Sequence, residues 1–359
     1  MIKVLNVLGG MNFGGIEMLL KNYSETINRN EFIYDFLTCE PEENATINAI
    51  KDTGSKVFYY TRKRISFSKN IIESLVFLFN NRKYYDIIHI HLNYEGIQFL
   101  IFALIFGYKV RIAHSHTSFI GQKIGRFVQV KCKLTKLLSN YHAGCSNESN
   151  LFLFSDTQKC DVIPNAIDYE KFSFSLKNRK KFRKELKLTD GEKAVVLVGR
   201  FNEEKNHKFI CELVRDYKLS NMHIFFIGEG DMKDEIALQI KKMDLANFIT
   251  ILGSRNNISE ILSAFDLCIL PSIHEGFPMV LIEAQVNGMK CIVSENVPEN
   301  VDISGNCVFI PLSKNVWSRT LNEIQCFNKR DFKGNQEFNI KNSILQLENL
   351  YKKCVEVKV

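Results

Sequence analysis

The sequence has little that would mark a disordered or membrane-spanning chain. It contains only six prolines in 359 residues, and no low-complexity tract or internal repeat stands out, so disorder is not expected. The longest apolar run, Phe99 to Phe106, falls far short of the roughly 20 residues that a membrane span needs. We expect a buried helix there, and a helix lying against a bilayer surface is the alternative.

The cysteines have no spacing that would suit a metal site or a redox pair. Ten are scattered along the chain, without a C-x-x-C pair and without histidines at ligand spacing. We therefore expect reduced, mostly buried thiols in a cytoplasmic protein. The opening residues, MIKVLNVLGG, predict a strand followed by a glycine turn and not a signal peptide.

Acidic residues are absent from Lys109 to Asn147, where seven lysines and arginines lie. They are Lys109, Arg111, Lys123, Arg126, Lys131, Lys133 and Lys136. A second basic cluster lies upstream, and the formal net charge of the whole chain is +7. The upstream cluster consists of Arg62, Lys63, Arg64 and Lys69. Such a face attracts anionic lipid, phosphate-bearing ligands or nucleic acid, and an ordinary solvated surface is the alternative. No nucleic-acid motif accompanies it, so we expect no nucleic-acid partner.

Short β-rich runs alternate with helical patterns along the whole chain, and the alternation restarts after a lysine-rich segment near residue 180. Nearly continuous apolar strands separated by helices indicate parallel sheets covered on both faces. We expect an α/β protein with two Rossmann-like domains, residues 1–170 and 190–335, whose parallel sheets face a central cleft. Residues 336–359 are expected to form a helix that returns to the first domain.

The first turn between strand and helix is glycine-rich, running from Gly9 to Glu17. Glycine lets the backbone approach a phosphate or a sugar closely, and a helix N-terminus favours negative charge. The spacing does not match the G-x-G-x-x-G dinucleotide pattern. A plain tight turn therefore remains the alternative.

Two cations follow the first strand of the second half, in the stretch VGRFNEEKNH. Arg200 offers a rigid fork of donors for phosphate oxygens, and Lys205 offers a mobile point charge. Together they could hold a diphosphate and balance the charge of a leaving group. A pair of surface cations without a ligand is the alternative.

Two glutamates lie eight positions apart in HEGFPMVLIEA, around a Gly-Phe-Pro turn. Pro278 suits the first turn of a helix, and we expect the helix to begin at Phe277 or Pro278. Its free amides would face a ligand, with Glu275 in the preceding loop and Glu283 on the same side of the helix as Met279. A carboxylate accepts two hydroxyl hydrogen bonds, as a sugar or ribose diol can offer.

These motifs resemble those of retaining glycosyltransferases of family 4, which have the GT-B fold. EGFPMVLIEA resembles the E-x7-E signature, and the Arg200–Lys205 stretch, VIPNAID, IGEG and ILGSR occur in the same order as in that family. The resemblance covers nearly the whole chain. One departure is Lys290, which stands where the family usually has proline.

The resemblance implies a role for each motif. Arg200 and Lys205 would bind the donor diphosphate, and Glu283 the nucleotide ribose. Glu275 and the turn formed by Gly276, Phe277 and Pro278 would contact the transferred sugar and its phosphates. Gly15 would lie against the phosphates, while Gly253 and Arg255 would border the base. The first domain would hold the acceptor.

In this family a histidine at the end of a strand faces the reacting sugar. RIAHSHT offers His114 and His116, which point the same way in a strand, and we favour His116 because it is nearer the carboxyl end. A core or loop histidine is the alternative. His89 and His91 could line the acceptor side or serve packing.

The predicted activity is transfer of a sugar, with UDP as the favoured nucleotide, to a glycan or polyprenyl-diphosphate-linked saccharide in capsule, exopolysaccharide or O-antigen synthesis. We expect retention of configuration and no metal or cofactor, because Arg200, Lys205 and a helix N-terminus could neutralise the leaving nucleotide. Peripheral contact with an anionic membrane at its inner face would suit a lipid-linked acceptor. The alternatives are a nucleotide-sugar 2-epimerase of the same architecture and a non-catalytic binding protein.

Overall fold

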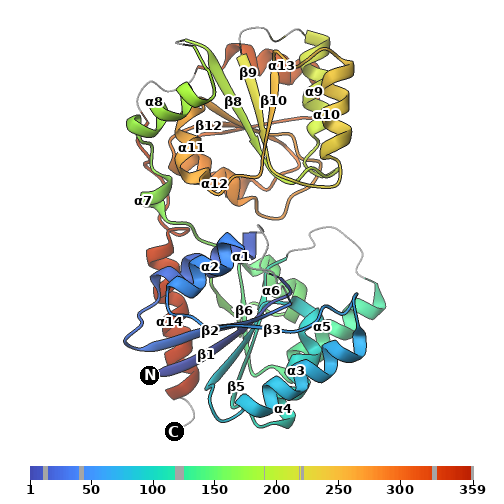
Figure 1. The fold of residues 1–359 in the computed structure, drawn as a ribbon, viewed down its shortest axis with the longest axis vertical. Coiled ribbons are helices and arrows are strands. Elements are labelled where there is room, and N and C mark those ends of the chain that lie inside the picture. The colour runs from blue at the N-terminus through green and yellow to red at the C-terminus, as the bar shows by residue number, and fades with distance from the viewer. Residues whose placement is uncertain are drawn as a thin grey trace. The chain divides into compact units, whose positions relative to one another are not determined.

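The computed structural model describes residues 1–10, 15–39, 44–117, 125–189, 191–217, 219, 222–325 and 330–356. The chain forms two compact units. Unit 1 contains Met1–Ile167 and Glu337–Val359, and unit 2 contains Asp168–Gln336. Each unit is built on its own parallel β-sheet (Figure 1). The segment between residues 170 and 190, which the sequence pattern left between the two domains, belongs to unit 2.

Unit 1 holds a seven-stranded parallel sheet in the order β3-β2-β1-β4-β5-β6-β7. Its strands are β1 Ile2–Val7, β2 Phe32–Thr38, β3 Val57–Tyr59, β4 Ile87–Ile90, β5 Val110–Ser115, β6 Tyr141–Gly144 and β7 Asp161–Val162. Its helices are α1 Gly15–Thr26, α2 Ala45–Asp52, α3 Phe67–Asn81, η1 (a 3-10 turn) Asn93–Gly96, α4 Ile97–Ile105, α5 Arg126–Leu138, α6 Asn147–Phe154 and α14 Ile340–Glu356.

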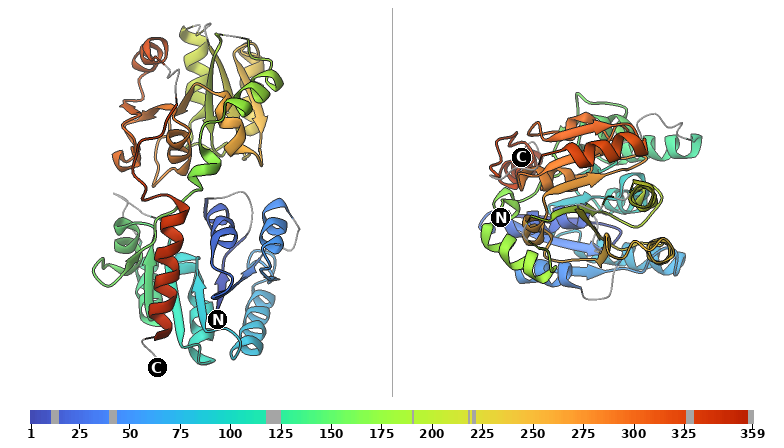
Figure 2. Two further views of the ribbon diagram at one scale, coloured as in Figure 1. Left: turned by 90° about the vertical axis from the view of Figure 1, so that its left-hand side faces the viewer. Right: turned by 90° about the horizontal axis from the view of Figure 1, so that it is seen from above.

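Alternate residues of the unit 1 strands pack on opposite faces of the sheet, as the period of a strand requires. Val4 and Ile87 lie in the core beneath α1 and α14, whereas Leu5 and Ile88 lie in the core beneath α3 and α4. The last helix, α14, returns along the sheet of unit 1 (Figure 2). The Tyr23 hydroxyl of α1 lies 2.5 Å from the Ser343 hydroxyl of α14.

Unit 2 holds a six-stranded parallel sheet in the order β10-β9-β8-β11-β12-β13. Its strands are β8 Lys193–Val198, β9 Met222–Ile227, β10 Ile249–Gly253, β11 Leu267–Leu270, β12 Lys290–Ser294 and β13 Cys307–Ile310. Its helices are α7 Tyr169–Phe172, α8 Leu176–Glu185, α9 His207–Tyr217, α10 Lys233–Lys242, α11 Ile258–Ile261, η2 Leu262–Ala264, α12 Met279–Val286, η3 Glu299–Val301 and α13 Lys314–Glu323. The prediction of two parallel sheets flanked by helices is therefore confirmed.

Some details differ from the expectation. Helix α12 begins at Met279, with Pro278 as its N-cap residue in an extended conformation. Helix α4 is only half buried: Phe99 and Ala103 pack on the sheet, whereas Leu104 and Ile105 are exposed. The buried helix expected at Phe99 to Phe106 is thus buried on one side only, because the run is apolar on both sides of the helix. Among the described residues, no helix is long and apolar enough to cross a membrane.

The described cysteines are all free, and most are buried, as expected from their scattered spacing. The lysine-rich segment after residue 175 also has a structural role. Arg179 and Arg183 of α8 bind the carboxylate of Asp266 at 2.7 and 3.2 Å. The same carboxylate accepts a hydrogen bond from the backbone N–H of Ala194 at 2.8 Å. A buried arginine, Arg330, lies 3.4 Å from it as well.

Because Asp266 neutralises several partly buried arginines, its removal leaves uncompensated buried charge. We expect Asp266→Ala to lower the free energy of unfolding by about 3 kcal/mol, measured by urea denaturation. Glu260→Gln is the matched control, since Glu260 pairs with Lys181 at 3.7 Å on an exposed surface and such pairs contribute little. Equal losses in the two variants would contradict this role for Asp266.

Candidate functional site

The predicted donor residues of unit 2 lie in loops that leave the carboxyl edge of its sheet. Backbone hydrogen bonds join these loops to one another. The N–H of Gly199 donates to the carbonyl of Ile227 at 3.0 Å, and the N–H of Phe201 donates to Glu229 at 3.0 Å. The loops that follow β8 and β9 are thus held side by side. Arg200 lies between Gly199 and Phe201, the two residues that these hydrogen bonds fix.

Two glycines permit this close approach. Gly228 has a φ of 152°, and a Cβ atom there would overlap the carbonyl oxygen of Gly199. A Cβ atom on Gly199 would lie 3.0 Å from the Cδ and Cε atoms of Lys205. The absence of side chains at these two positions therefore lets the strand ends pack together and lets the lysine stem lie across the backbone.

The loop with Arg200 and Lys205 is joined in turn to the loop after β11. Ile273 donates its N–H to the carbonyl of Glu204 at 2.8 Å, and the side chain of Asn206 donates to the carbonyl of Pro271 at 3.1 Å. As a result, the Lys205 ammonium lies 2.5 Å from the Glu275 carboxylate. The Ser272 hydroxyl donates to the same carboxylate oxygen at 2.7 Å. The sequence motifs predicted both charged residues, but nothing in them indicated the contribution of Ser272.

Glu283 lies in the second turn of α12, and its surroundings differ from those of Glu275. It is partly buried in an apolar helix, and within the described part of the chain its carboxyl has no hydrogen-bond or ion-pair partner. Burial raises its pKa to about 8, because a charged carboxylate is poorly solvated there. A perturbed, unpartnered carboxyl beside a helix N-terminus is a mark of a binding site.

The other predicted residues of unit 2 lie at the same edge of the sheet, and they differ in whether another residue already contacts them. Arg200 is exposed, and its guanidinium has no ion-pair partner among the described residues. Arg255 pairs with Glu185 at 3.1 Å. Gly253 has a φ of 70°, and a Cβ atom there would lie 3.2 Å from the Glu229 carboxylate. The turn of Gly276, Phe277 and Pro278 leads into α12, whose first amides have no side-chain cap.

Two predicted residues belong to unit 1. Gly15 is the exposed first residue of α1, and most of the preceding glycine-rich loop, residues 11–14, lies outside the described residues. His116 follows directly after β5, whereas His114 is fully buried inside that strand. The two imidazole rings are stacked, with centroids 4.2 Å apart.

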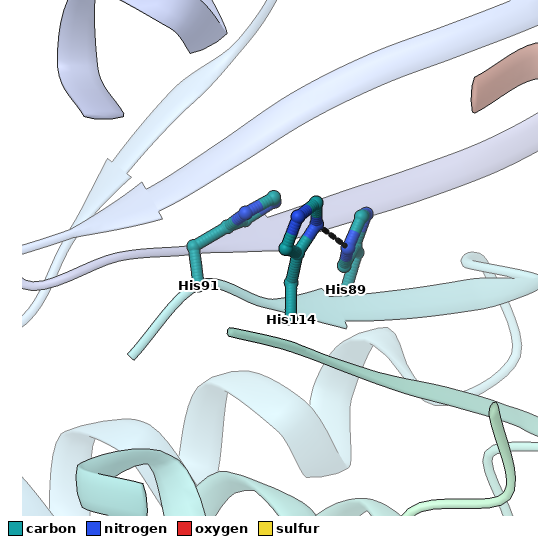
Figure 3. A group of neighbouring side chains, drawn as sticks. All are labelled: His89, His91 and His114. Carbon is teal, nitrogen blue, oxygen red and sulfur yellow. Dashed lines mark hydrogen bonds between the residues drawn. The ribbon is translucent and has the colours of Figure 1, made fainter. Parts of the chain in front are cut away.

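His114 and His116 belong to a cluster of four imidazoles, because HIH on β4 and HSH on β5 place histidines at the strand period on neighbouring strands. His89 lies 3.1 Å from His114, and His91 lies 2.9 Å from His116, in each case between ring nitrogens. Figure 3 shows the rings of His89, His91 and His114 standing side by side on the same face of the sheet. The Tyr351 hydroxyl of α14 lies 2.8 Å from His89.

Hydrogen bonds fix the protonation pattern of one pair of rings. The amide nitrogen of Asn6 donates to the carbonyl of Asp35 at 3.2 Å, so its Oδ1 faces Nε2 of His91, 3.2 Å away. His91 must then carry its proton on Nε2 and accept at Nδ1. Its partner His116 therefore donates from Nε2 and keeps a lone pair on Nδ1.

Burial keeps these rings neutral. It lowers the pKa of His116 to about 4, against an opposing effect of the Asn165 side chain. The pKa values of His89, His91 and His114 are also lowered well below the usual value, first by burial and then by neighbouring imidazoles. The sequence suggested the repeated histidine pattern, but the contributions of Asn6 and Tyr351 required the tertiary fold.

Three of these histidines could in principle hold a metal ion. One ring nitrogen each of His89, His91 and His114 lies within 4.8 Å of the others. Both ring nitrogens of His89 and of His91 are already hydrogen-bonded, and only Nε2 of His114 has no partner among the described residues. An ion would have to displace these bonds, so the geometry fits an imidazole network better than a metal centre.

Comparison with known proteins finds relatives of the whole chain and a family that matches unit 2. Residues 178–308 match the model of the family Glycosyl transferases group 1. The chain is 27% identical to the UDP-Gal:alpha-D-GlcNAc-diphosphoundecaprenol alpha-1,3-galactosyltransferase of Escherichia coli, covering 91% of this chain and 86% of that protein. It is 26% identical to the capsular polysaccharide biosynthesis glycosyltransferase CapH of Staphylococcus aureus, covering 98% and 99%.

A solved structure with the same fold is that of HepE from Anabaena in complex with UDP-glucose. It superposes with a TM-score of 0.74 at 15% identity, covering 99% of this chain and 98% of that one. The fold is that of the GT-B glycosyltransferases. The chain thus has the GT-B fold and a unit 2 that matches a glycosyltransferase family, and it is similar over most of its length to glycosyltransferases of polysaccharide biosynthesis, as its motifs suggested.

The raised pKa of Glu283 predicts a pH dependence of stability. The folded protein keeps a proton up to about pH 8, whereas the unfolded chain releases it near about pH 4.3. The contribution of this group to the free energy of unfolding therefore falls as the pH rises through that window, by up to about 1.4 kcal/mol per pH unit.

Glu283→Gln keeps the size of the side chain and removes its titration. We expect the variant to gain stability relative to the wild type as the pH rises from 5 to 8 (approximate bounds from the two pKa values), measured by denaturant unfolding. Glu275→Gln is the control for loss of an acid at the same edge. A constant difference between wild type and Glu283→Gln over this range would show that Glu283 is ionised in the folded protein.

The hydrogen-bond chain predicts a single tautomer of His116. Nitrogen-15 spectra of the imidazoles should show its proton on Nε2 and no titration until the pH approaches about 4. Asn6→Leu removes the acceptor that orients His91, and we expect both tautomers of His116 in that variant. His223, in unit 2, serves as the unaffected reference. Titration of His116 near its ordinary pKa in the wild type would contradict the proposed chain.

Proposed function

We propose that this protein transfers a sugar from a UDP-sugar to a saccharide acceptor, with retention of configuration and without a metal ion. The observation that carries the proposal is the gathering of Arg200, Lys205, Glu275 and the unpartnered Glu283 at one edge of the unit 2 sheet. Cations suit a diphosphate, and carboxyl groups suit the hydroxyls of a ribose and a sugar.

The diphosphate would be held by Arg200, Lys205 and the first amides of α12. Arg200 has its donors available for phosphate oxygens, and the uncapped helix N-terminus adds favourable dipoles. Lys205 already pairs with Glu275, so a bound diphosphate would compete for the ammonium. Loss of that ion pair would free Glu275 to accept hydrogen bonds from hydroxyls of the transferred sugar.

The nucleoside would occupy the other part of the same edge. Glu283 would bind the ribose diol, which would supply the partners that its carboxyl lacks among the described residues. Gly253 and Arg255 would border the base, at the end of β10. On unit 1, Gly15 would approach the phosphates and His116 the reacting sugar; these last assignments rest on the family resemblance.

In the transfer step, the bond between the anomeric carbon and the diphosphate oxygen breaks while the acceptor oxygen bonds to that carbon on the same face. The departing phosphate takes the acceptor proton, so no separate base is needed. The nearby cations stabilise the charge that develops on the leaving group. A neutral His116 could contact the sugar without adding positive charge beside an oxocarbenium-like centre.

Relatives support the substrate classes. The Escherichia coli relative is named for a UDP-galactose donor and a diphosphoundecaprenol-linked acceptor, and HepE was solved with UDP-glucose. We therefore propose a UDP-sugar donor and a lipid-linked saccharide acceptor for this chain. A 2-epimerase or a non-catalytic binding protein would use the same donor pocket but would form no new glycoside.

A thermal-shift screen of UDP-sugars tests the donor site. We expect at least one UDP-sugar to raise the melting temperature of the wild type, because a ligand that binds only the folded state stabilises it. Glu283→Ala should lose that shift, whereas Lys208→Ala, at an exposed position near Lys205, should keep it. Equal shifts in wild type and Glu283→Ala would remove Glu283 from the site.

Product analysis with the same UDP-sugar and a polyprenyl-diphosphate-linked saccharide then separates the activities. A transferase gives a new glycoside, and an epimerase gives a changed UDP-sugar without an acceptor. Arg200→Ala should lower the rate of transfer by about 100-fold or more while Lys208→Ala leaves it unchanged. Wild-type rates in Arg200→Ala would contradict its role with the diphosphate.

A further inference from the structure

The outer surface of α3, α4 and α5 in unit 1 is unusually apolar for the outside of a protein. Each helix buries one side against the sheet and still exposes large apolar side chains on the other. Eight of them are between 47 and 78% exposed. They are Phe67, Ile72 and Val76 on α3, Leu104 and Ile105 on α4, and Phe127, Val130 and Leu137 on α5. We call this surface, formed by the outer sides of α3, α4 and α5, the apolar helix face.

Unit 2 provides an internal comparison, since its helices cover a parallel sheet in the same manner. Helices α9, α10 and α13 pack on one face of that sheet, and among their described residues only Tyr217 and Leu238 are large exposed apolar side chains. The polar outside of these helices is what water contact favours. The apolar helix face of unit 1 therefore calls for a partner.

The three helices form one continuous surface. They lie together on one side of the unit 1 sheet (Figure 1). Phe79 of α3 contacts Phe106, at the end of α4, with ring centroids 5.4 Å apart. Helix α5 is tied to η1, the turn that leads directly into α4, through the ion pair of Lys131 with Glu95, at 2.7 Å. Exposed apolar groups on the three helices can thus meet one partner together.

Positive charge accompanies these apolar groups. Residues 62–137 contain 13 lysines and arginines but only three acidic residues, which leaves 34 basic and 37 acidic residues in the rest of the chain. The whole positive excess of the protein thus lies in this stretch. Lys63, Arg64, Lys69, Arg126 and Lys133 are all exposed.

Some of these cations lie directly against apolar side chains. The Arg82 guanidinium is 3.9 Å from the centre of the Phe79 ring, and the Lys131 ammonium is 4.8 Å from the Phe127 ring. Long basic side chains can keep their charge in a headgroup layer while neighbouring apolar groups enter the hydrocarbon boundary. A nucleic acid would match the charge but would leave Ile72, Leu104 and Ile105 without apolar contacts.

We propose that the apolar helix face of unit 1 docks on the surface of an anionic phospholipid bilayer. The apolar side chains enter the interface, and the surrounding lysines and arginines bind the negative headgroups. Each basic residue near such a surface adds to the attraction, and salt weakens it. The inference stands on this surface alone and does not depend on the proposed donor chemistry, although a lipid-linked acceptor would lie at the same membrane.

Co-sedimentation of the full chain with vesicles tests the proposal. We expect binding to vesicles that contain phosphatidylglycerol, weaker binding to pure phosphatidylcholine vesicles, and partial release at high salt, because salt screens the headgroup attraction. The double variant Ile105→Glu/Phe127→Glu should weaken binding to the anionic vesicles by about tenfold or more. Lys63→Glu/Arg64→Glu should weaken it and reduce its salt dependence.

Leu238→Glu is the matched control, because Leu238 is a comparably exposed apolar residue on α10 of unit 2. It should bind vesicles like the wild type. All these positions are exposed, so the melting temperature of each variant should stay near that of the wild type. Unchanged UDP-sugar shifts would show that the donor site is intact, whatever the vesicles show.

Three results would overturn the proposal. The first is absence of wild-type binding to anionic vesicles, and the second is equal binding to neutral and anionic vesicles. The third is a wild-type oligomer in solution that Ile105→Glu/Phe127→Glu dissociates, with no effect of these substitutions on vesicle binding. That result would assign the apolar helix face to contact between copies of this chain.

Discussion

The arrangement of the donor site depends on one close contact between backbones in unit 2. Gly228 meets the carbonyl of Gly199 at a distance that excludes any side chain, so the loops after β8 and β9 can be joined by hydrogen bonds. That junction fixes Arg200 and sets the stem of Lys205 across Gly199. Without it, the lysine would have no defined path to Glu275, and the edge of the sheet would hold separate surface charges.

The sequence predicted the fold well because its signals are local. Apolar strands separated by amphipathic helices require parallel sheets, and HEGFPMVLIEA places Glu275 and Glu283 around a helix start whatever the rest of the chain does. It could not predict that Glu275 and Lys205 are ion-paired, since 70 residues separate them. Likewise, only the tertiary fold brings Arg179 and Arg183 to Asp266, which turns an apparent linker into part of unit 2.

The histidines show a different limit of sequence reasoning. Their spacing in HIH and HSH predicts that all four point to one side of the sheet, but the pattern cannot tell a metal centre from a hydrogen-bonded stack. Asn6 of β1 and Tyr351 of α14 favour the hydrogen-bonded stack. They bond Nε2 of His91 and Nδ1 of His89, which a metal ion would otherwise need. These partners are far from the histidines in sequence, and no local motif indicates them.

The lysines and arginines at the donor edge of unit 2 are arranged differently from those on the outer helices of unit 1. At the donor edge of unit 2, hydrogen bonds between loops fix the backbone beside Arg200 and Lys205, which would suit a single diphosphate whose charge grows as its bond to the sugar breaks. In unit 1, the cations are numerous, exposed and spread over three helices, which suits an extended anionic surface and no single ligand. The histidines of unit 1 stay neutral because they are buried, so they add nothing to this positive surface. On the two proposals, lysine and arginine would therefore bind one ligand where loop contacts fix them, and an extended surface where they lie exposed on several helices.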